Sequence, residues 1–355
     1  MKKVAIIGIQ GVPASYGGFE SLVENIIGEN QSSDISYTIY CSSKDMKTIL
    51  PEYKGAKLRY IPLHANGIQS IPYDIWAMLR SIRGFDTILV LGTSGCLFLP
   101  FLKLLSGKRL VVNIDGLEHR REKWGKLARW VLKTSEKMAV RFADVIISDN
   151  KGIQDYVTDT YGKYSEMIAY GGDHVLRNVT LAKQQDFLNL YGLSAGEYAI
   201  KVCRIEPENN CQIVLEAFAR SGKQLVFIGN WNKSEYARQL RDKYKDIPNI
   251  MILDAIYDLD ILYTLRLNAK YYVHGHSAGG TNPSLVEAMF FGRPILAYDV
   301  VYNRETTKQE AYYFKTVEDL VELLERNDLI GERMSEIAWE NYTWRKIAKA
   351  YEKLY

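Results

Sequence analysis

The sequence predicts an α/β protein built from two doubly wound domains, each with a parallel sheet covered by helices on both faces. Short runs rich in Val, Ile, Leu and Tyr alternate with amphipathic segments along the chain. This alternation pauses in a polar stretch at 173–197 and then begins again. Buried parallel strands are apolar on both sides because helices cover both faces of the sheet, so a pattern given twice indicates two such domains.

Each predicted strand is a short apolar run bounded by turn residues, and helical patterns separate most of these runs. In the first domain the runs are 2–9, 37–43, 57–63, 87–92, 109–115 and 144–149, with an edge strand at 167–172. In the second domain they are 197–204, 224–229, 249–254, 269–275 and 294–299. After Phe314 the pattern becomes helical and ends in WRKIAKAYEKLY. These patterns divide the chain into domains at 1–175 and 190–335 and a terminal segment at 336–355.

The composition excludes several classes of protein. The chain has 355 residues, and its 45 Lys and Arg against 42 Asp and Glu give a formal charge of +3, too balanced for a nucleic-acid binder by bulk charge. Its four cysteines form no CxxC pair and no metal-ligand spacing, so we expect no disulfide or structural metal, and a reducing cytoplasm fits. No run reaches the roughly 18 apolar residues of a membrane span, and the apolar start predicts a first strand rather than a signal peptide.

The segment HGHSAGGTNPSLVEAM, 274–289, concentrates special backbone between a strand and a helix. Gly279 and Gly280 permit close backbone approach, and a helix is expected to start near Asn282 or Pro283. Exposed N–H groups in such a turn can bind an anion such as a diphosphate. Glu287, one turn further on, could accept hydroxyls of a ribose. The alternative is a tight strand–helix turn followed by a solvated Glu.

Two other strand ends offer groups for the same chemistry. Arg204 ends the first strand of the second domain, where its guanidinium could clamp phosphate oxygens; alone, it could equally form a surface ion pair. GVPASYGGFE places Gly11, Gly17 and Gly18 between a strand and a helix. Its spacing is not GxGxxG and no ribose-binding acid follows about 20 residues later, which disfavours a simple NAD site. Two facing domains would form a cleft at the carboxyl ends of their strands.

These three sites, in this order, resemble the retaining glycosyltransferases of the GT-B fold, in the large family-four group that includes bacterial capsule and cell-wall enzymes. The resemblance spans nearly the whole chain, and its motifs are weak singly but specific together. They are Gly17, Gly18 and Glu20; Arg204 with Pro207; SLVEAM with Gly292 and Pro294; NRE at 303–305; and Trp344. The resemblance implies two Rossmann-like domains facing a cleft, with the terminal helix crossing back to the N-terminal domain.

The chain departs from the family pattern at two positions. The family usually has a first glutamate where this chain has Gly279, and a lysine where it has Asn209. With GIQGVPASYGGFE, NIDGLEHRREKWGKLARW, CRIEPENN and HGHSAGGTNPSLVEAM, these departures resemble the subgroup that transfers L-rhamnose from dTDP-rhamnose in capsule or rhamnan synthesis. A 6-deoxy L-sugar presents different hydroxyls from glucose, which gives a reason to rebuild the sugar-binding loop.

The resemblance implies front-side attack, in which the leaving diphosphate helps to take the proton of the acceptor hydroxyl and no metal or cofactor is required. The protein then acts chiefly by electrostatic stabilisation, and Asp115, Glu118 and Arg204 are the expected catalytic residues. His119, beside two arginines, is expected at the surface. The expected donor-binding residues are Gly17, Gly18, Arg204, Asn209, Gly279, Gly280, Thr281, Asn282, Pro283, Ser284 and Glu287.

The expected partners are the nucleotide sugar and a saccharide acceptor, which the resemblance suggests is lipid-linked. Segment 119–141 is basic on several turns and contains Trp124 and Trp130, so it could lie on an anionic membrane, here the inner face of the plasma membrane; an ordinary core-facing helix is the alternative. Three other functions stay open: the same enzyme with a UDP-hexose donor, a non-catalytic GT-B partner, and a sugar-nucleotide epimerase. The last would need acid–base groups, for which Asp115, Glu118, His274 and His276 are the candidates.

Overall fold

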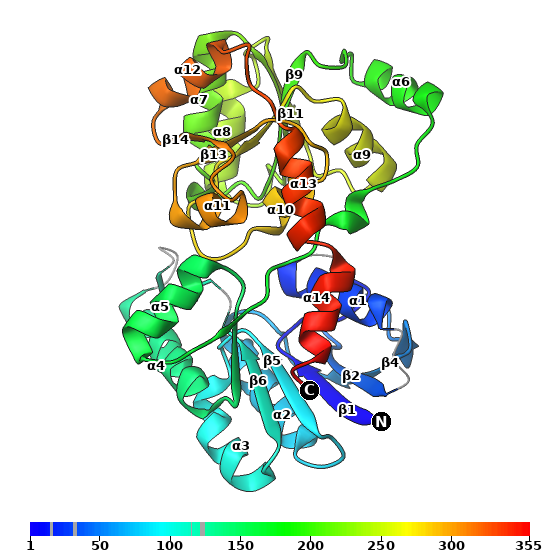
Figure 1. Ribbon diagram of the computed structural model, residues 1–355, viewed down its shortest axis with the longest axis vertical. Helices are drawn as coiled ribbons and strands as arrows, with labels where there is room; N and C mark the ends of the chain where they lie inside the picture. Colours follow the sequence, from blue (N-terminus) through cyan, green and yellow to red (C-terminus); the bar gives the residue numbers. More distant parts are fainter. Residues whose placement is uncertain (15–16, 31–33, 115, 121–124) are drawn as a thin grey trace. The chain divides into compact units, whose positions relative to one another are not determined.

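The computed structural model describes residues 1–14, 17–30, 34–114, 116–120 and 125–355 (Figure 1). The chain forms two compact units: unit 1 is Met1–Tyr170 with Trp344–Tyr355, and unit 2 is Gly171–Thr343. Each unit has a mainly or wholly parallel sheet, and the last helix returns to unit 1. The predicted fold class is therefore confirmed.

The sheet of unit 1 has the strand order β3-β4-β2-β1-β5-β6-β7-β8. All its pairs are parallel except β3 with β4, and Val4 of the central β1 pairs with Tyr37 on one side and Thr87 on the other. Its strands are β1 (Lys2–Ile7), β2 (Ile35–Ser42), β3 (Glu52–Tyr53), β4 (Ala56–Ile61), β5 (Thr87–Leu91), β6 (Arg109–Asn113), β7 (Val145–Ser148) and β8 (Glu166–Met167).

Helices follow most of these strands, as parallel crossovers require. They are α1 (Gly18–Glu29), α2 (Ser70–Ser81), α3 (Leu99–Ser106), α4 (Lys126–Phe142), α5 (Lys151–Tyr161) and the returning α14 (Trp344–Glu352), with short 3-10 turns η1 (Gly67–Gln69), η2 (Cys96–Phe98) and η3 (Glu118–Arg120). Figure 1 shows α1 and α14 side by side, and both pack into one apolar cluster with the central strands. The last helix thus completes the core of unit 1.

Side chains and backbone groups both fasten α14 to the sheet. Ile347 and Tyr351 are buried in the cluster with α1. Asn113 donates from Nδ2 to the Tyr351 hydroxyl at 2.8 Å, and Arg109 donates from Nε to the carbonyl of Leu354 at 2.5 Å. Burial of aliphatic and aromatic side chains supplies most of this attachment, because each hydrogen bond contributes only about 1 kcal/mol of net free energy.

The sheet of unit 2 is parallel throughout, in the order β11-β10-β9-β12-β13-β14. Its strands are β9 (Tyr198–Val202), β10 (Gln224–Ile228), β11 (Ile250–Leu253), β12 (Tyr271–His274), β13 (Ile295–Tyr298) and β14 (Tyr312–Phe314). Its helices are α6 (Leu181–Leu190), α7 (Cys211–Ser221), α8 (Glu235–Tyr244), α9 (Leu259–Leu267), α10 (Pro283–Met289), α11 (Val301–Thr306), α12 (Val317–Glu325) and α13 (Glu332–Asn341), with the 3-10 turns η4 (Asp173–Val175) and η5 (Pro207–Asn209).

The structure differs from the sequence prediction at the edges of the sheets. The pattern did not predict β3 or β14, and the strand expected at 167–172 is reduced to the two residues of β8. The polar stretch 173–197, expected as the junction, contributes η4 and α6 to unit 2, and the chain passes between the units at Tyr170 and Gly171. None of the described helices is long and apolar enough to cross a membrane.

The burial of α14 predicts a stability defect from a truncated side chain there. Ile347→Ala should lower the free energy of unfolding by about 2–4 kcal/mol, since it removes buried methyl groups and leaves a cavity in the core of unit 1. Urea-induced unfolding of the full chain measures this. Lys349→Ala, on the exposed side of the same helix, is the matched control and should change stability by less than about 0.5 kcal/mol. Equal effects of the two substitutions would contradict the packing of α14 described above.

Candidate functional site

The strand order of unit 2 creates a natural opening between β9 and β12. From β9 the chain winds outward through β10 and β11, then returns to β12 on the other side of β9. Loops leaving the carboxyl ends of β9 and β12 therefore diverge, and open α/β sheets bind ligands at such a point. Arg204 follows β9, and the glycine turn at 279–280 follows β12. The structure thus places these two predicted regions at the ends of neighbouring strands.

Asn209 ties the two strand-end loops together. Its side chain is buried, its Nδ2 donates to the carbonyl of Arg204 at 2.9 Å, and its Oδ1 lies 2.9 Å from Nδ1 of His276. Next to it, Asn210 donates from Nδ2 to the carbonyl of Gly275 at 2.8 Å. Both ends of the Asn209 amide are thus used within the protein. This geometry fits a positioning role better than direct contact with a ligand.

The Arg204 side chain is exposed beyond the carboxyl end of β9. The neighbouring thiol of Cys203 reports the local electrostatics. Burial raises its pKa, but a hydrogen bond from Cys211 and the positive charges of Lys201 and Arg204 outweigh burial and lower the pKa to about 7. A thiol becomes a thiolate more readily where the potential is positive. The end of β9 is therefore an electropositive region suited to an anion.

The glycine turn after β12 has the backbone that the sequence predicts. Gly279 and Gly280 have φ angles of 47° and 46°, a left-handed conformation that favours glycine. Helix α10 then begins at Pro283, as expected. Its N-cap is Asn282, whose Oδ1 accepts from the backbone N of Ser284 at 3.0 Å and from the Ser284 hydroxyl at 2.7 Å.

Glu287 on α10 is held by two basic side chains from other elements. Its Oε2 lies 2.6 Å from a terminal nitrogen of Arg266, and its Oε1 lies 3.5 Å from Nε2 of His174. The side chain is only 18% exposed, so the alternative of a freely solvated Glu is wrong. Sequence analysis missed Arg266 and His174, since neither lies in a motif and each meets Glu287 only through the fold.

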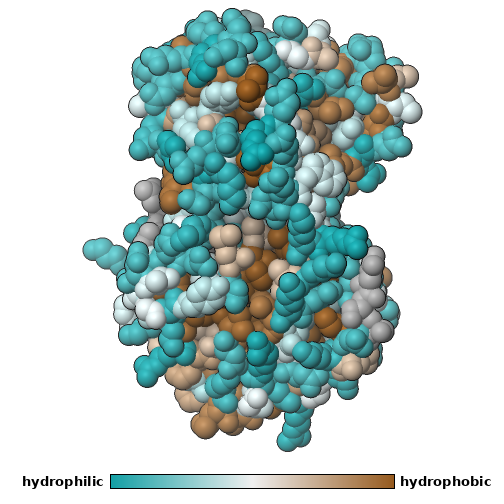
Figure 2. Space-filling view, viewed as in Figure 1, coloured by the Kyte–Doolittle hydropathy of each residue, from teal (hydrophilic) through white to brown (hydrophobic). Residues whose placement is uncertain are grey.

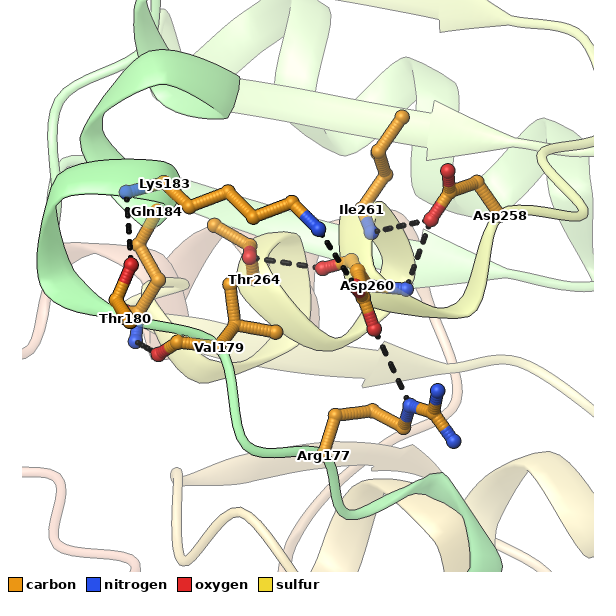
Figure 3. A network of polar contacts seen from close by, with 9 residues as sticks. All are labelled: Arg177, Val179, Thr180, Lys183, Gln184, Asp258, Asp260, Ile261 and Thr264. Atoms are coloured by element: carbon orange, nitrogen blue, oxygen red, sulfur yellow. Dashed lines mark hydrogen bonds and ion pairs between the residues drawn. The ribbon is translucent and has the colours of Figure 1, made fainter.

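Arg266 sits on α9, and a polar network anchors that helix to α6 (Figure 3). Asp260 accepts from Nζ of Lys183 at 2.8 Å and from Nε of Arg177 at 3.2 Å. Asp258 caps the helix by accepting from the backbone N of Asp260 and of Ile261. These contacts fix the position of α9, and with it the guanidinium that orients Glu287.

The histidines near the turn are buried. Burial, with the charges of His276 and Lys201, holds the pKa of His274 well below its usual range, so this ring is neutral at physiological pH. Its Nε2 is buried without a hydrogen-bond partner in the structure. The Nδ1 atom of His276 is hydrogen-bonded to Oδ1 of Asn209. Within the described ranges, His, Cys, Asp and Glu side chains form no group of three or more that could hold a metal ion.

In unit 1 the predicted glycine loop stands at the carboxyl end of β1, and the strand order changes direction between β1 and β5. Gly17 caps α1 with φ of 119°, and a Cβ there would lie 1.9 Å from Oε2 of Glu20. Glu20 in turn accepts from the backbone N of Gln10 at 2.9 Å. The carboxylate of Glu20 therefore links Gln10, just after β1, to helix α1 and lies close to Gly17.

The other predicted residues of unit 1 lie after β6. Asp115 lies outside the described residues, as do residues 121–124, which include Trp124. Glu118 begins η3 and is half-buried. The expectation that His119 is a surface residue is wrong: its side chain is 10% exposed, and its Nδ1 lies 3.0 Å from Oε2 of Glu136. A carboxylate on α4, invisible to local sequence patterns, accounts for the burial of this ring.

Comparison with known proteins divides the chain in the same two parts. Residues 193–330 match the family described as Glycosyl transferases group 1, and residues 1–173 match a domain of unknown function (DUF1972). An uncharacterized glycosyltransferase of Methanocaldococcus jannaschii is 20% identical over 404 aligned positions, which cover 100% of this chain and 99% of the relative. Most of unit 2 thus matches the group 1 glycosyltransferase family.

Solved structures share the fold over the full length of the chain. Sucrose-phosphate synthase from Thermosynechococcus elongatus has a TM-score of 0.82 at 16% identity, covering 100% of this chain and 98% of that one. The Anabaena protein HepE in complex with UDP-glucose has a TM-score of 0.77 at 12% identity, with 99% of each chain covered. At these identities the likeness shows the fold alone, which is the two-domain GT-B type.

The Glu136 cluster predicts a pH-dependent contribution to stability. Burial raises the pKa of Glu136, but hydrogen bonds from His119, Tyr161 and Tyr156 outweigh burial and hold it below its usual value. Because the folded pKa is lowered, this stabilisation is present above the unfolded pKa of about 4.3 and is lost as the pH falls through the folded value. Glu136→Gln should therefore lower the free energy of unfolding by about 2 kcal/mol near neutral pH, and the variant should unfold at a lower temperature than wild type.

Thermal unfolding of both proteins from pH 7 to pH 3 tests this expectation. The difference between them should shrink as the pH falls below about 4.3. Glu52→Gln, which makes the same change of charge on the exposed β3, is the matched control. A difference that stays constant to pH 3 would contradict the lowered pKa of Glu136.

Proposed function

We propose that this glycosyltransferase moves a sugar from a nucleotide sugar to a saccharide acceptor, and that unit 2 binds the donor. The observation that supports the placement of the donor is the position of Arg204 and the 279–280 turn at the ends of two neighbouring strands. Between them they offer a guanidinium and backbone N–H groups, the two kinds of donor that bind a diphosphate best.

The proposed contacts follow from the chemistry of each group. Arg204 would bind diphosphate oxygens, and the backbone of Gly279 and Gly280 would add N–H donors, since Pro283 has no N–H and that of Ser284 is used by Asn282. Glu287 would accept a hydroxyl of the pentose, the 3′-hydroxyl alone in a dTDP sugar or both ribose hydroxyls in a UDP sugar, with Arg266 and His174 keeping its carboxylate oriented. The N–H groups of Gly17 and Gly18 are the contribution proposed for unit 1. Asn209 would act indirectly, by fixing the loop that bears Arg204.

The donor that we propose is dTDP-L-rhamnose, on the strength of the motif resemblance and of Gly279, which leaves no carboxylate for a hexose hydroxyl at that position. A UDP-hexose is the second candidate, because the similar fold of HepE was solved in complex with UDP-glucose. The two differ in the base, in the pentose and in the sugar that is transferred, but share the diphosphate. The diphosphate contacts proposed above therefore apply to both.

The reaction that we propose retains the configuration at the anomeric carbon. The bond from that carbon to the diphosphate oxygen breaks while the acceptor oxygen bonds to the same face, and the acceptor proton passes to the departing diphosphate oxygen. Positive groups that stabilise the developing charge on the diphosphate would supply most of the rate enhancement. Asp115 and Glu118 remain proposed contacts of the donor sugar or of the acceptor hydroxyl.

The burial of the histidines removes two of the four acid–base candidates for an epimerase and leaves Asp115 and Glu118. Such an enzyme needs an acid–base group that reaches the sugar, whereas His274 is buried and neutral and His276 is hydrogen-bonded to Asn209. A non-catalytic partner would bind nucleotide sugar without turnover. Incubation with dTDP-rhamnose separates the three functions, since transfer or slow hydrolysis supports the transferase, an isomerised sugar the epimerase, and binding without turnover the partner.

Substitution of the proposed donor contacts tests the site. Arg204→Ala and Glu287→Ala should each lower turnover at least about tenfold, which corresponds to 1.4 kcal/mol of transition-state stabilisation. Arg220→Ala, which removes an exposed arginine from the end of α7, is the control and should keep the wild-type rate. Thermal shift with a panel of nucleotide sugars identifies the donor, because a selective ligand stabilises the folded state. Wild-type rates in folded Arg204 and Glu287 variants would reject their roles.

We further propose that the acceptor is lipid-linked and that unit 1 approaches it along an anionic membrane. Exposed apolar side chains gather on neighbouring helices α3 and α4, among them Leu104, which is 84% exposed, and Trp130, which is 66% exposed. Figure 2 shows apolar side chains at the lower end of unit 1, where Figure 1 places α3. The remaining exposed apolar residues of these two helices are Phe101, Leu105 and Leu127.

The charges on α4 complement an anionic surface. Its exposed positions include Lys126, Arg129, Lys133, Lys137 and Arg141, and its single acidic residue, Glu136, is buried. Apolar side chains beside exposed cations are the features that bind a helix to anionic lipid. The contribution of α3 was not predicted from the sequence, because the basic segment at 119–141 contains only α4.

Vesicle co-sedimentation tests the proposed membrane contact. The full chain should bind vesicles that contain phosphatidylglycerol more tightly than pure phosphatidylcholine vesicles. Replacing Leu104 and Leu105 together with Gln should weaken that binding about tenfold, because their side chains would no longer enter the interface. Leu190→Gln, at an equally exposed leucine of unit 2, is the control. Equal binding to vesicles with and without phosphatidylglycerol would reject the proposed membrane contact and would not affect the proposed transferase activity.

A further inference from the structure

Lys201 is an unusual residue for the interior of a sheet. It lies on the central strand β9, its side chain is 1% exposed, and it ranks among the largest fully buried side chains of the chain. Its Nζ donates to the carbonyl of Asn209 at 3.2 Å and stands 5.5 Å from the centre of the Phe227 ring. Among the residues that the structure describes, no carboxylate lies within ion-pair distance of this ammonium.

A buried ammonium without a carboxylate partner is expensive. Removal of a charge from water costs several kcal/mol, and one carbonyl, one aromatic face and the hydrogen bond with the Cys203 thiol compensate only part of that cost. An apolar side chain of similar volume would fit the surrounding core without the penalty. Positions that break the rules of core composition without structural benefit are commonly functional ones. We therefore expect Lys201 to have a function other than packing in the core of unit 2.

The surroundings of Lys201 show where its charge acts. Its Nζ donates to the backbone carbonyl of Asn209. The side chain of the same asparagine is hydrogen-bonded to the carbonyl of Arg204 and to His276. A Cβ on Gly275 would lie 2.9 Å from Nζ of Lys201, so the start of the loop after β12 also passes directly over the ammonium. The charge thus lies beneath the two strand-end loops that diverge at the opening of the sheet.

We propose that Lys201 is a positioning residue and second cation for the diphosphate of the donor, acting from beneath the site while Arg204 contacts the ligand directly. The proposal rests on the function proposed above. Its charge acts through protein rather than water, so screening is weak and the field at the loops is strong. Its effect on neighbours supports this. Against burial, it helps the hydrogen bond from Cys211 and the charge of Arg204 to lower the pKa of Cys203, and it adds to burial and to His276 in lowering the pKa of His274. The hydrogen bond to Asn209 also keeps the Arg204 turn in register.

Two neutral variants separate charge from packing. Lys201→Met removes both the charge and the hydrogen bond to Asn209, whereas Lys201→Gln removes the charge but keeps an N–H donor. Lys270→Met is the matched control. It removes the same charge from an exposed position just before β12, at the amino-terminal ends of the strands and so at the far end from the site. Isothermal titration calorimetry with dTDP and UDP, and with the uncharged thymidine and uridine, measures the affinities.

For both Lys201 variants we expect about tenfold weaker binding of the preferred nucleoside diphosphate and unchanged binding of its nucleoside. Both should unfold at the wild-type temperature or above, since a buried unpaired charge has been removed. Diphosphate affinity equal to wild type, equal losses for nucleoside and diphosphate, or recovery in Lys201→Gln alone would each overturn the charge role. Failure of the wild-type chain to bind either diphosphate would instead reject the proposed function.

Discussion

The candidate site depends on one buried amide. Asn209 uses its side-chain nitrogen, its side-chain oxygen and its backbone carbonyl to hold Arg204, His276 and Lys201. These three residues come from both strands that flank the opening of the unit 2 sheet. A backbone hydrogen bond from Ser277 to the carbonyl of Glu208, at 2.8 Å, reinforces the same junction. Loops at strand ends are normally mobile, so this fastening gives the site the rigidity that selective anion binding requires.

Much of the fold could be predicted from the sequence because buried parallel strands leave a strong apolar signal. That signal fails at the edges. β3 is two residues long and pairs antiparallel beside β4, while Tyr312 and Tyr313 of β14 are half-buried on an edge strand. Short edge strands need few apolar residues, so their sequences resemble loops. The helix start at Pro283 was predictable because capping chemistry is local.

The site was predictable only where its residues stand next to strand ends. Arg204, the 279–280 turn and Glu287 follow apolar runs, so their location could be inferred from the order of elements. Lys201 and Arg266 could not be found this way, since their partners are set by the register of the sheet and by the packing of α9. In an alternating strand pattern a lysine predicts a solvent-facing position, and only the covering loops make Lys201 an interior residue.

The two buried cations of unit 2 illustrate different uses of charge. Arg266 is matched by Glu287, so the pair adds no net charge and instead fixes the direction of a carboxylate. Lys201 has no carboxylate partner among the described residues, so its charge remains available to the loops above it. Compared with the family pattern, this chain has Asn209 in place of a lysine and Gly279 in place of a glutamate, and these two changes cancel in net charge. Lys201 adds a positive charge beneath the same loops. That charge favours a diphosphate over an uncharged sugar as the group that the site binds.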